Sequence, residues 1–187
     1  MIVLCLSGLY PHGKEAGCVR NSIWEQAQRL VEQYGTRDPF ELMEYLGINL
    51  RIRDNLGNLK GFYYTLSRER YVAVNGKLHS RDQLLVGAHE LGHDRLHREL
   101  AKVSPLKDFA FYEVTSHTEY EANLFAAEFL ISDGDVEVCL EEELDYLALC
   151  RTLGFHPQLV SFKLYGMMGR GYRLNLPEGL NSRFLGK

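Results

Sequence analysis

The chain has 187 residues, of which 45% are hydrophobic and 25% are charged, and its formal net charge is -4. This length fits a single domain over residues 1–187 whose core needs no disulfides. The acidic balance argues against direct binding of nucleic acid, and no apolar run is long enough to span a membrane. No secretion signal is recognisable, so a cytoplasmic protein is expected.

Two helices are predicted in the first part of the chain, after a loosely packed leader at residues 1–21. Ser22 begins a capping-box sequence, so the first helix is expected to run from there to Gly35. Asp38 is followed by proline, which suits the first position of a helix. The second helix is therefore predicted to begin there and to end at Gly47.

A small sheet is predicted next. Apolar and polar residues alternate from Ile48 to Ile52, which indicates one strand, and two further β-rich runs lie at 59–66 and 71–75. These patterns predict a mixed or antiparallel sheet of about three strands. We expect the strand at 71–75 to keep an open edge, to which an extended peptide could pair.

Helices are predicted for most of the remaining chain. The first covers 81–98 and is apolar on more than one face, as is typical of a helix inside a core. A polar loop at 101–115 precedes a long helix over 116–131, and two or three shorter helices end near residue 170. The tail at 171–187 is expected to be irregular and loosely packed. This order of elements indicates an α+β fold.

The helix at 81–98, with Ser80 as its expected cap, carries the sequence H-E-x-x-H. His89 and His93 are four residues apart, so both imidazoles project from one face and can bind one Zn²⁺. Glu90 lies beside them, where a general base can take a proton from the attacking water. An ordinary surface pair of histidines is the competing interpretation, and the apolar character of this helix disfavours it.

A catalytic zinc site needs a third protein ligand. The next long helix offers Glu119 as the first choice and Glu121 as the second. Asn123 shares a face with Glu119 and can hold a ligating histidine in place. Both acids also fit capping-box positions, so either could simply cap the helix. His97 lies two turns beyond the first histidine and is expected to miss the ion.

Three segments in this order resemble the ImmA/IrrE family of zinc metallopeptidases: Tyr71-Val-Ala-Val-Asn75, Ala88-His-Glu-Leu-Gly-His93 and Glu119-Tyr-Glu-Ala-Asn-Leu-Phe-Ala-Ala-Glu128. H-E-L-G-H is widespread among zincins, but its combination with the third segment is more specific. The resemblance covers roughly residues 22–162. It implies a zincin-like fold with the sheet packed on the H-E-x-x-H helix, and Glu119 as the third ligand. The family's Leu-Leu-Met-Pro-like ending is replaced by a stretch without proline.

The resemblance also implies an endopeptidase with one catalytic Zn²⁺ that cleaves a helix-turn-helix transcriptional repressor. Open sites with these ligands also hold Fe²⁺ or Mn²⁺. The group that stabilises the oxyanion is not identified; Tyr112, His117 and Tyr120 are candidates by proximity in sequence. One competing function is a zincin-fold regulator that binds a repressor without cutting it. Another is a DNA-binding helical protein that uses the basic C-terminal segment.

Charge is uneven in the second half of the chain. Residues 118–150 contain ten acids and no lysine or arginine, whereas 151–187 contain six bases and one acid. An acidic band could attract the basic, DNA-reading face of a repressor. The plainer interpretation is that these are solvated helix faces and metal-site carboxylates.

Overall fold

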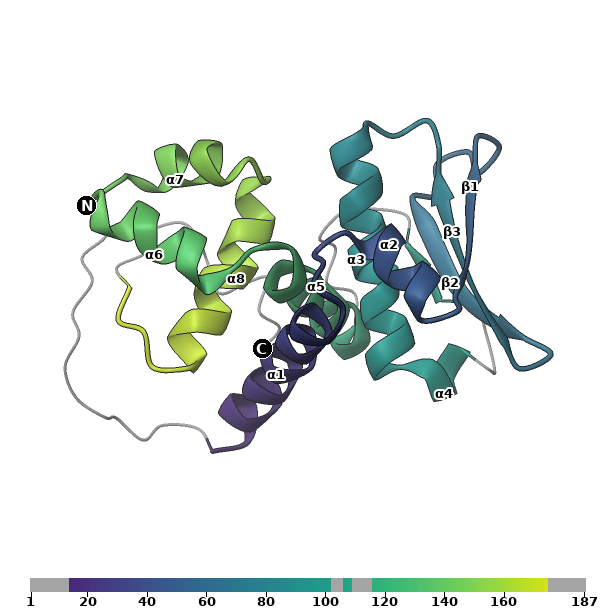
Figure 1. The fold of residues 1–187 in the computed structure, drawn as a ribbon, viewed down its shortest axis with the longest axis horizontal. Helices are drawn as coiled ribbons and strands as arrows, with labels where there is room; N and C mark the ends of the chain where they lie inside the picture. The colour runs from purple at the N-terminus through teal and green to yellow at the C-terminus, as the bar shows by residue number, and fades with distance from the viewer. Residues whose placement is uncertain (1–13, 102–105, 109–115, 175–187) are drawn as a thin grey trace.

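Eight helices and four strands occur in the part of the chain that the structure, a computed structural model, describes: residues 14–101, 106–108 and 116–174 (Figure 1). In chain order they are α1 Lys14–Tyr34, α2 Pro39–Tyr45, β1 Asn49–Arg53, β2 Gly61–Leu66, β3 Glu69–Asn75, α3 Ser80–Leu96, α4 Arg98–Ala101, β4 Leu106–Asp108, α5 His117–Leu130, α6 Asp133–Glu141, α7 Tyr146–Leu153 and α8 Pro157–Gly169. The predicted α+β class is confirmed.

The sheet is mixed, with the strand order β1-β3-β2-β4. β1 runs parallel to β3, while β2 is antiparallel to both β3 and β4. It has one strand more than predicted, because β4 has only three residues, too few for an alternating pattern, and is recognised by its pairing with β2. The open edge expected for β3 is wrong, since β3 pairs on both sides.

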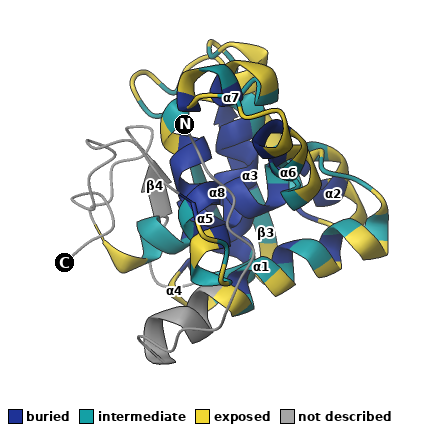
Figure 2. Ribbon diagram, turned by 90° about the vertical axis from the view of Figure 1, so that its left-hand side faces the viewer, coloured by how far each residue is buried: buried dark blue, intermediate teal, exposed yellow. Residues whose placement is uncertain are grey.

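The helix α3 lies between the sheet and α5, and Figure 2 shows it among the buried elements. Its residues from Leu85 to Asp94 are all buried, as its apolar faces predicted. The cap is His79 rather than Ser80, since the His79 Nδ1 accepts the Arg81 N–H. The predicted capping box fails because the Gln83 side chain donates to two loop carbonyls instead.

The first helix starts earlier than predicted. α1 is already helical at Lys14, so Ser22 lies inside it and the later part of the expected leader is ordered. Lysine, glutamate and alanine at 14–16 favour a helix, and serine is tolerated in its interior. The end of α1 and the start of α2 are as predicted: Gly35 has a φ of 71°, and Asp38 caps α2.

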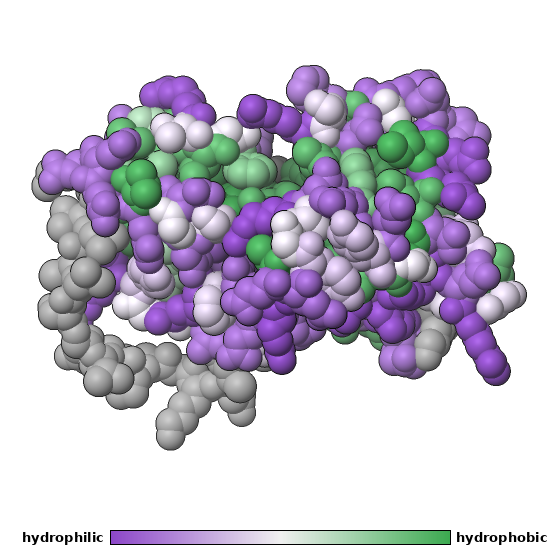
Figure 3. Space-filling model, viewed as in Figure 1, coloured by the Kyte–Doolittle hydropathy of each residue, from purple (hydrophilic) through white to green (hydrophobic). Residues whose placement is uncertain are grey.

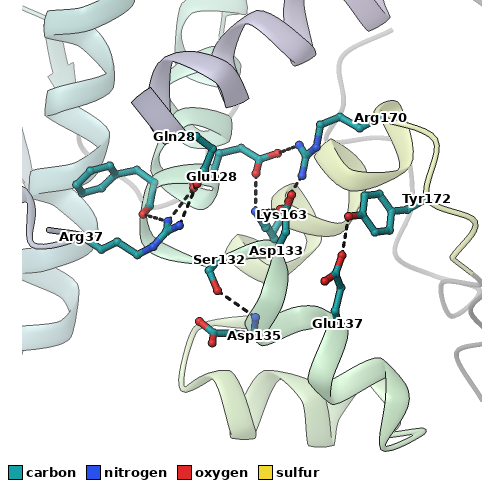
Figure 4. Close-up of polar contacts among 11 residues, drawn as sticks. Gln28, Arg37, Glu128, Ser132, Asp133, Asp135, Glu137, Lys163, Arg170 and Tyr172 are labelled. Carbon is teal, nitrogen blue, oxygen red and sulfur yellow. Dashed lines mark hydrogen bonds and ion pairs between the residues drawn. The ribbon is translucent and has the colours of Figure 1, made fainter. Parts of the chain in front are cut away.

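A buried cluster of charged side chains joins the C-terminal end of α5 to α6 and α8 (Figure 4). The Lys163 ammonium lies 2.6 Å from Glu128 and also contacts Asp133. Arg170 pairs with Glu128 and lies 2.7 Å from Asp133. Lys163 and Glu128 are both fully buried. Two acids of the predicted acidic band therefore pair with internal cations, so for these two residues neither the attraction of a basic partner nor a solvated helix face is the correct interpretation.

A hollow of about 340 Å³ lies beside the first turns of α3, between that helix and α7. Figure 3 shows hydrophobic surface on both sides of it. Its apolar lining consists of Leu84, Leu130, Leu153 and Phe155. Within the described segments, none of the helices combines the length and apolar character that crossing a membrane requires.

Candidate metal centre

Two histidines of α3 form one wall of a buried cluster. His89 and His93 are 4% and 1% exposed, and their Nε2 atoms lie 3.1 Å apart. The rings meet edge to face, with centroids 4.7 Å apart. The four-residue spacing on a helix therefore brings the same nitrogen of both rings to one point, as the sequence predicted.

Glu119 reaches this point from the first turn of α5. Its carboxylate oxygens lie 3.2 Å from the His89 Nε2 and 3.4 Å from the His93 Nε2. The helix is capped by Ser116, whose hydroxyl accepts the Glu119 backbone N–H, and the Glu119 side chain contacts the two histidines. The ligand atoms of His89, His93 and Glu119 all lie within 4.8 Å of one another, so these three residues could hold a metal ion.

Glycine at position 92 lets α5 come this close to α3. A Cβ on Gly92 would lie 3.1 Å from the Ala122 Cα and 3.2 Å from its carbonyl oxygen. Such contacts with backbone atoms are not easily relieved, so a larger side chain would push the helices apart. Because Glu119 stands one turn before Ala122, its distance to the histidines depends on this packing.

The electrostatics give His93 and Glu119 the protonation states that a metal requires. Burial, with a smaller effect from His89, lowers the pKa of His93 to about 4, although Glu119 opposes this. Burial raises the pKa of the Glu119 carboxyl, but its contacts with His89 and His93 outweigh that effect and hold the pKa well below its usual value. At neutral pH His93 is uncharged and Glu119 is ionised. Such imidazole and carboxylate donors are typical zinc ligands.

Each histidine makes a further contact through its Nδ1. The His89 Nδ1–H donates to the Asn123 side-chain oxygen at 3.1 Å, and Asn123 is one turn after Glu119, as predicted. The His93 Nδ1 lies 3.1 Å from the Nδ1 of His97, which is itself buried. Glu121, the second choice for the third ligand, lies 2.8 Å from the His97 Nε2 and is not part of the three-residue group.

Glu90 follows His89 on α3 and is fully buried. The start of β2 lies directly against its carboxylate: a Cβ on Gly61 would be 2.9 Å from the Glu90 Oε1 and would also collide with Val86. Glycine at position 61 therefore lets the strand pass close to this side chain. The sequence gives no local signal for this contact.

The three residues considered for oxyanion stabilisation have different surroundings. Tyr112 lies outside the described residues. The His117 side chain is 74% exposed, and its Nδ1 is 3.4 Å from Glu121. The Tyr120 hydroxyl is buried and its ring packs against Phe162.

A family model, described as the IrrE N-terminal-like domain (Peptidase_M78), matches residues 43–165. The chain belongs to this family. The matched segment contains β1 to β3, the three clustered residues and Glu90. The resemblance inferred from the three sequence motifs is thereby confirmed, and the chain is a member of a peptidase family.

The chain is also similar to the immunity region protein 2 of Bacillus phage phi105. The two are 36% identical over 106 residues, which cover 57% of this chain and 66% of the phage protein. The match thus spans slightly less than two thirds of that relative. No solved structure matches the chain.

Proposed function

We propose that this member of the IrrE N-terminal-like family is a zinc-dependent endopeptidase whose substrate is a helix-turn-helix transcriptional repressor. The observation that carries the proposal is the grouping of His89, His93 and Glu119 around one point, with Glu90 next to them on α3. This is the ligand number of a catalytic zinc site, which leaves a coordination position for water or substrate.

The donor set fits the ion. Two imidazole nitrogens with lone pairs and one ionised carboxylate match the preferences of zinc, and both histidines are oriented through their second nitrogen. When bound there, Zn²⁺ would acidify a water molecule and polarise the scissile carbonyl. Fe²⁺ and Mn²⁺ accept the same donors, so metal analysis of the purified protein checks the identity of the ion.

Glu90 is assigned the proton transfers. Its carboxylate would accept the proton of the attacking water and then donate it to the leaving amine, so that the peptide bond breaks with no net change in the protonation of Glu90. Its position supports this role, because α3 holds it in a buried site beside His89 and Gly61 leaves its carboxylate room.

The substrate is proposed from the relative and the family that the chain resembles. Its relative is an immunity region protein of a phage, and the ImmA/IrrE resemblance implies cleavage of repressors. We therefore propose an antirepressor role, in which cleavage of a repressor encoded beside this gene releases transcription. A non-cleaving regulator that binds the repressor is the competing function.

The Glu90→Gln variant tests the proposal. Purified protein loaded with Zn²⁺ is incubated with the neighbouring repressor, and the fragments are identified by mass spectrometry. We expect the variant to keep its zinc and to cleave at least about 100-fold more slowly, because the base is lost. The matched control is Glu44→Gln, at an exposed position of α2, which should cleave normally.

Release of the repressor from its operator separates the two functions. If Glu90→Gln releases the repressor as well as the wild-type protein does, the non-cleaving regulator is correct. If wild-type protein holds no metal under any loading condition, the metallopeptidase itself is excluded.

A further inference from the structure

The face of the sheet that points away from α3 carries a row of stacked aromatic rings. The Tyr63 hydroxyl donates to Asp94 of α3, so Tyr63 points to that helix. Its neighbours Phe62 and Tyr64 therefore point to the opposite face. The ring centroids of Phe62 and Tyr64 lie 5.5 Å apart, and those of Tyr64 and its cross-strand partner Tyr71 lie 4.9 Å apart. All three of these rings are partly exposed, so the row is open to a partner.

The same face is basic. Arg51 and Arg53 of β1 are exposed, and the register of β1 with β3 places Arg51 on the same face as Tyr71. The turn between β2 and β3 adds the exposed Arg68. Residues 49–75 contain five bases and two acids, a net charge of +3 in a chain whose net charge is -4. This sheet face, which comprises the aromatic row and the arginines of β1, therefore suits a partner that is both acidic and apolar.

The opposite end of the molecule has this chemistry. Figure 1 shows α6 and α7 at one end of the long axis and the sheet at the other. Val138 on α6 and Leu147 on α7 are 55% and 58% exposed. Val138 and Glu141 are three residues apart on α6, so an apolar and an acidic side chain share one face of that helix. Residues 133–145 contain seven acids and no base, and five of these acids are exposed: Asp135, Glu141, Glu142, Glu143 and Asp145.

We propose that the sheet face of one molecule binds the α6–α7 end of a second copy of this chain. Their charges are opposite, which favours the encounter and sets its orientation. The two surfaces cannot meet within one molecule, because they lie at opposite ends of it. Neither surface contains a residue of the metal cluster, so this inference goes beyond the proposed peptidase activity and does not depend on it.

The proposed contact is heterologous, because it joins two different surfaces. A pair of molecules still has one sheet face and one α6–α7 end unoccupied, so association continues past two copies. A symmetric dimer, in which one surface binds itself, would stop at two. Because both surfaces are charged, the contact should weaken as salt screens them.

Sedimentation velocity of the full-length protein tests the proposal. The average mass of the wild-type protein should rise with concentration past that of a dimer and return towards that of the monomer in about 1 M NaCl. Arg51→Ser/Tyr64→Ser alters the sheet face, and Val138→Ser/Glu141→Gln alters the α6–α7 end. Each should weaken association by at least about tenfold. Arg29→Ser is the matched control, because this exposed arginine of α1 belongs to neither surface, and it should associate normally.

A mixture of the two double variants gives the sharper result. Each keeps one intact surface, and the two intact surfaces are complementary, so the mixture should form dimers that do not grow further. Recovery of a dimer also shows that both variants are folded. Circular dichroism identifies an unfolded variant, for which the single change Arg51→Ser or Glu141→Gln, each at an exposed position, is substituted.

Three results would overturn the proposal. One is a wild-type protein that stays monomeric at every concentration. Another is a wild-type protein that associates while the mixture of folded variants does not, since association then uses a different surface. The third is a single-stranded oligothymidylate that binds the monomeric wild-type protein and binds Arg51→Ser/Tyr64→Ser more weakly, which would make nucleic acid the occupant of the sheet face.

Discussion

The two ends of α5 carry carboxylates with different kinds of partner: Glu128 is fully buried, and Glu119 is partly exposed. Near its C-terminal end, Glu128 contacts the cations of Lys163 and Arg170. At its first turn, Glu119 contacts two imidazoles, of which His93 is uncharged at neutral pH because burial lowers its pKa to about 4. The two acids are nine residues apart, about 13 Å along the helix.

The difference separates a charged cluster that needs no ligand from a group of residues that could hold a metal ion. The charged cluster around Glu128 supplies its own cations, so it holds α5, α6 and α8 together without a ligand. Glu119 contacts two imidazoles, whose ring nitrogens are typical zinc ligands. A metal ion bound there would be a positive partner for the Glu119 carboxylate, as Lys163 is for Glu128.

Removing the internal cation is expected to have the largest effect. Lys163→Met should lower the free energy of unfolding by about 3–5 kcal/mol, because Glu128 and Asp133 then share only Arg170. Urea denaturation of the metal-free protein measures this change. The double variant Glu128→Gln/Lys163→Met should recover part of the loss. A loss below about 1 kcal/mol would show that the cluster stabilises nothing.

The corresponding change at Glu119, in the first turn of α5, should lower metal affinity and leave the free energy of unfolding nearly unchanged. Glu119→Gln removes a proposed ligand, so zinc affinity should fall by more than the roughly 100-fold expected for a residue that only supports a ligand. The metal-free variant should unfold with a free energy much closer to that of the wild-type protein than Lys163→Met. Chelator competition measures the affinity, and Glu128→Gln, which should bind zinc normally when folded, is the control. Wild-type zinc affinity in Glu119→Gln would contradict the assignment.

The positions of the clustered residues and of Asn123 could be predicted from the sequence, because they form two pairs whose members lie four residues apart on one helix. His89 with His93, and Glu119 with Asn123, follow the helical period, and the structure brings these four together. The confirmed α+β class follows in the same way from local patterns. Asp38 and Gly35 mark helix ends through their own side chain and backbone, so they were also predicted correctly.

Contacts between distant segments were not accessible in this way. His97 was expected to miss the ion, and it lies outside the three-residue group. Its contact with Glu121 could not be predicted, because it joins positions 24 residues apart. Gly61 and Glu90 belong to a strand and a helix whose approach no local pattern specifies. β4 is a strand only because β2 pairs with it, and Lys163 is buried only because Glu128 and Asp133 surround it.

His93, in the cluster at the first turn of α5, should also make the free energy of unfolding depend on pH. The pKa of His93 is lowered from 6.5 to about 4 in the folded protein, so the unfolded chain binds more protons between these values. The free energy of unfolding must therefore fall as the pH drops through this window. For His93 alone the loss between pH 7 and pH 5 is about 2 kcal/mol.

Urea denaturation of the metal-free protein at pH 7 and pH 5 measures this dependence. His93→Gln is the control, and its stability should fall less over the same interval. Equal pH dependence in the two proteins would show that His93 titrates normally in the fold.

The smallest expected effect concerns the space around Glu90. Gly61→Ala would place a Cβ 2.9 Å from the Glu90 Oε1 and against Val86, so the carboxylate must move while the metal-binding residues stay in place. We expect turnover to fall about tenfold, with zinc affinity nearly unchanged, because the base is displaced by a fraction of an ångström. Gly134→Ala is the matched control, since its Cβ would meet only the Ser132 hydroxyl at 4.0 Å. The measurement is a steady-state comparison of kcat and KM for both variants. A normal kcat in Gly61→Ala would mean that the position of Glu90 does not limit the reaction. A lower kcat with retained zinc would place the role of Glu90 in the chemical step.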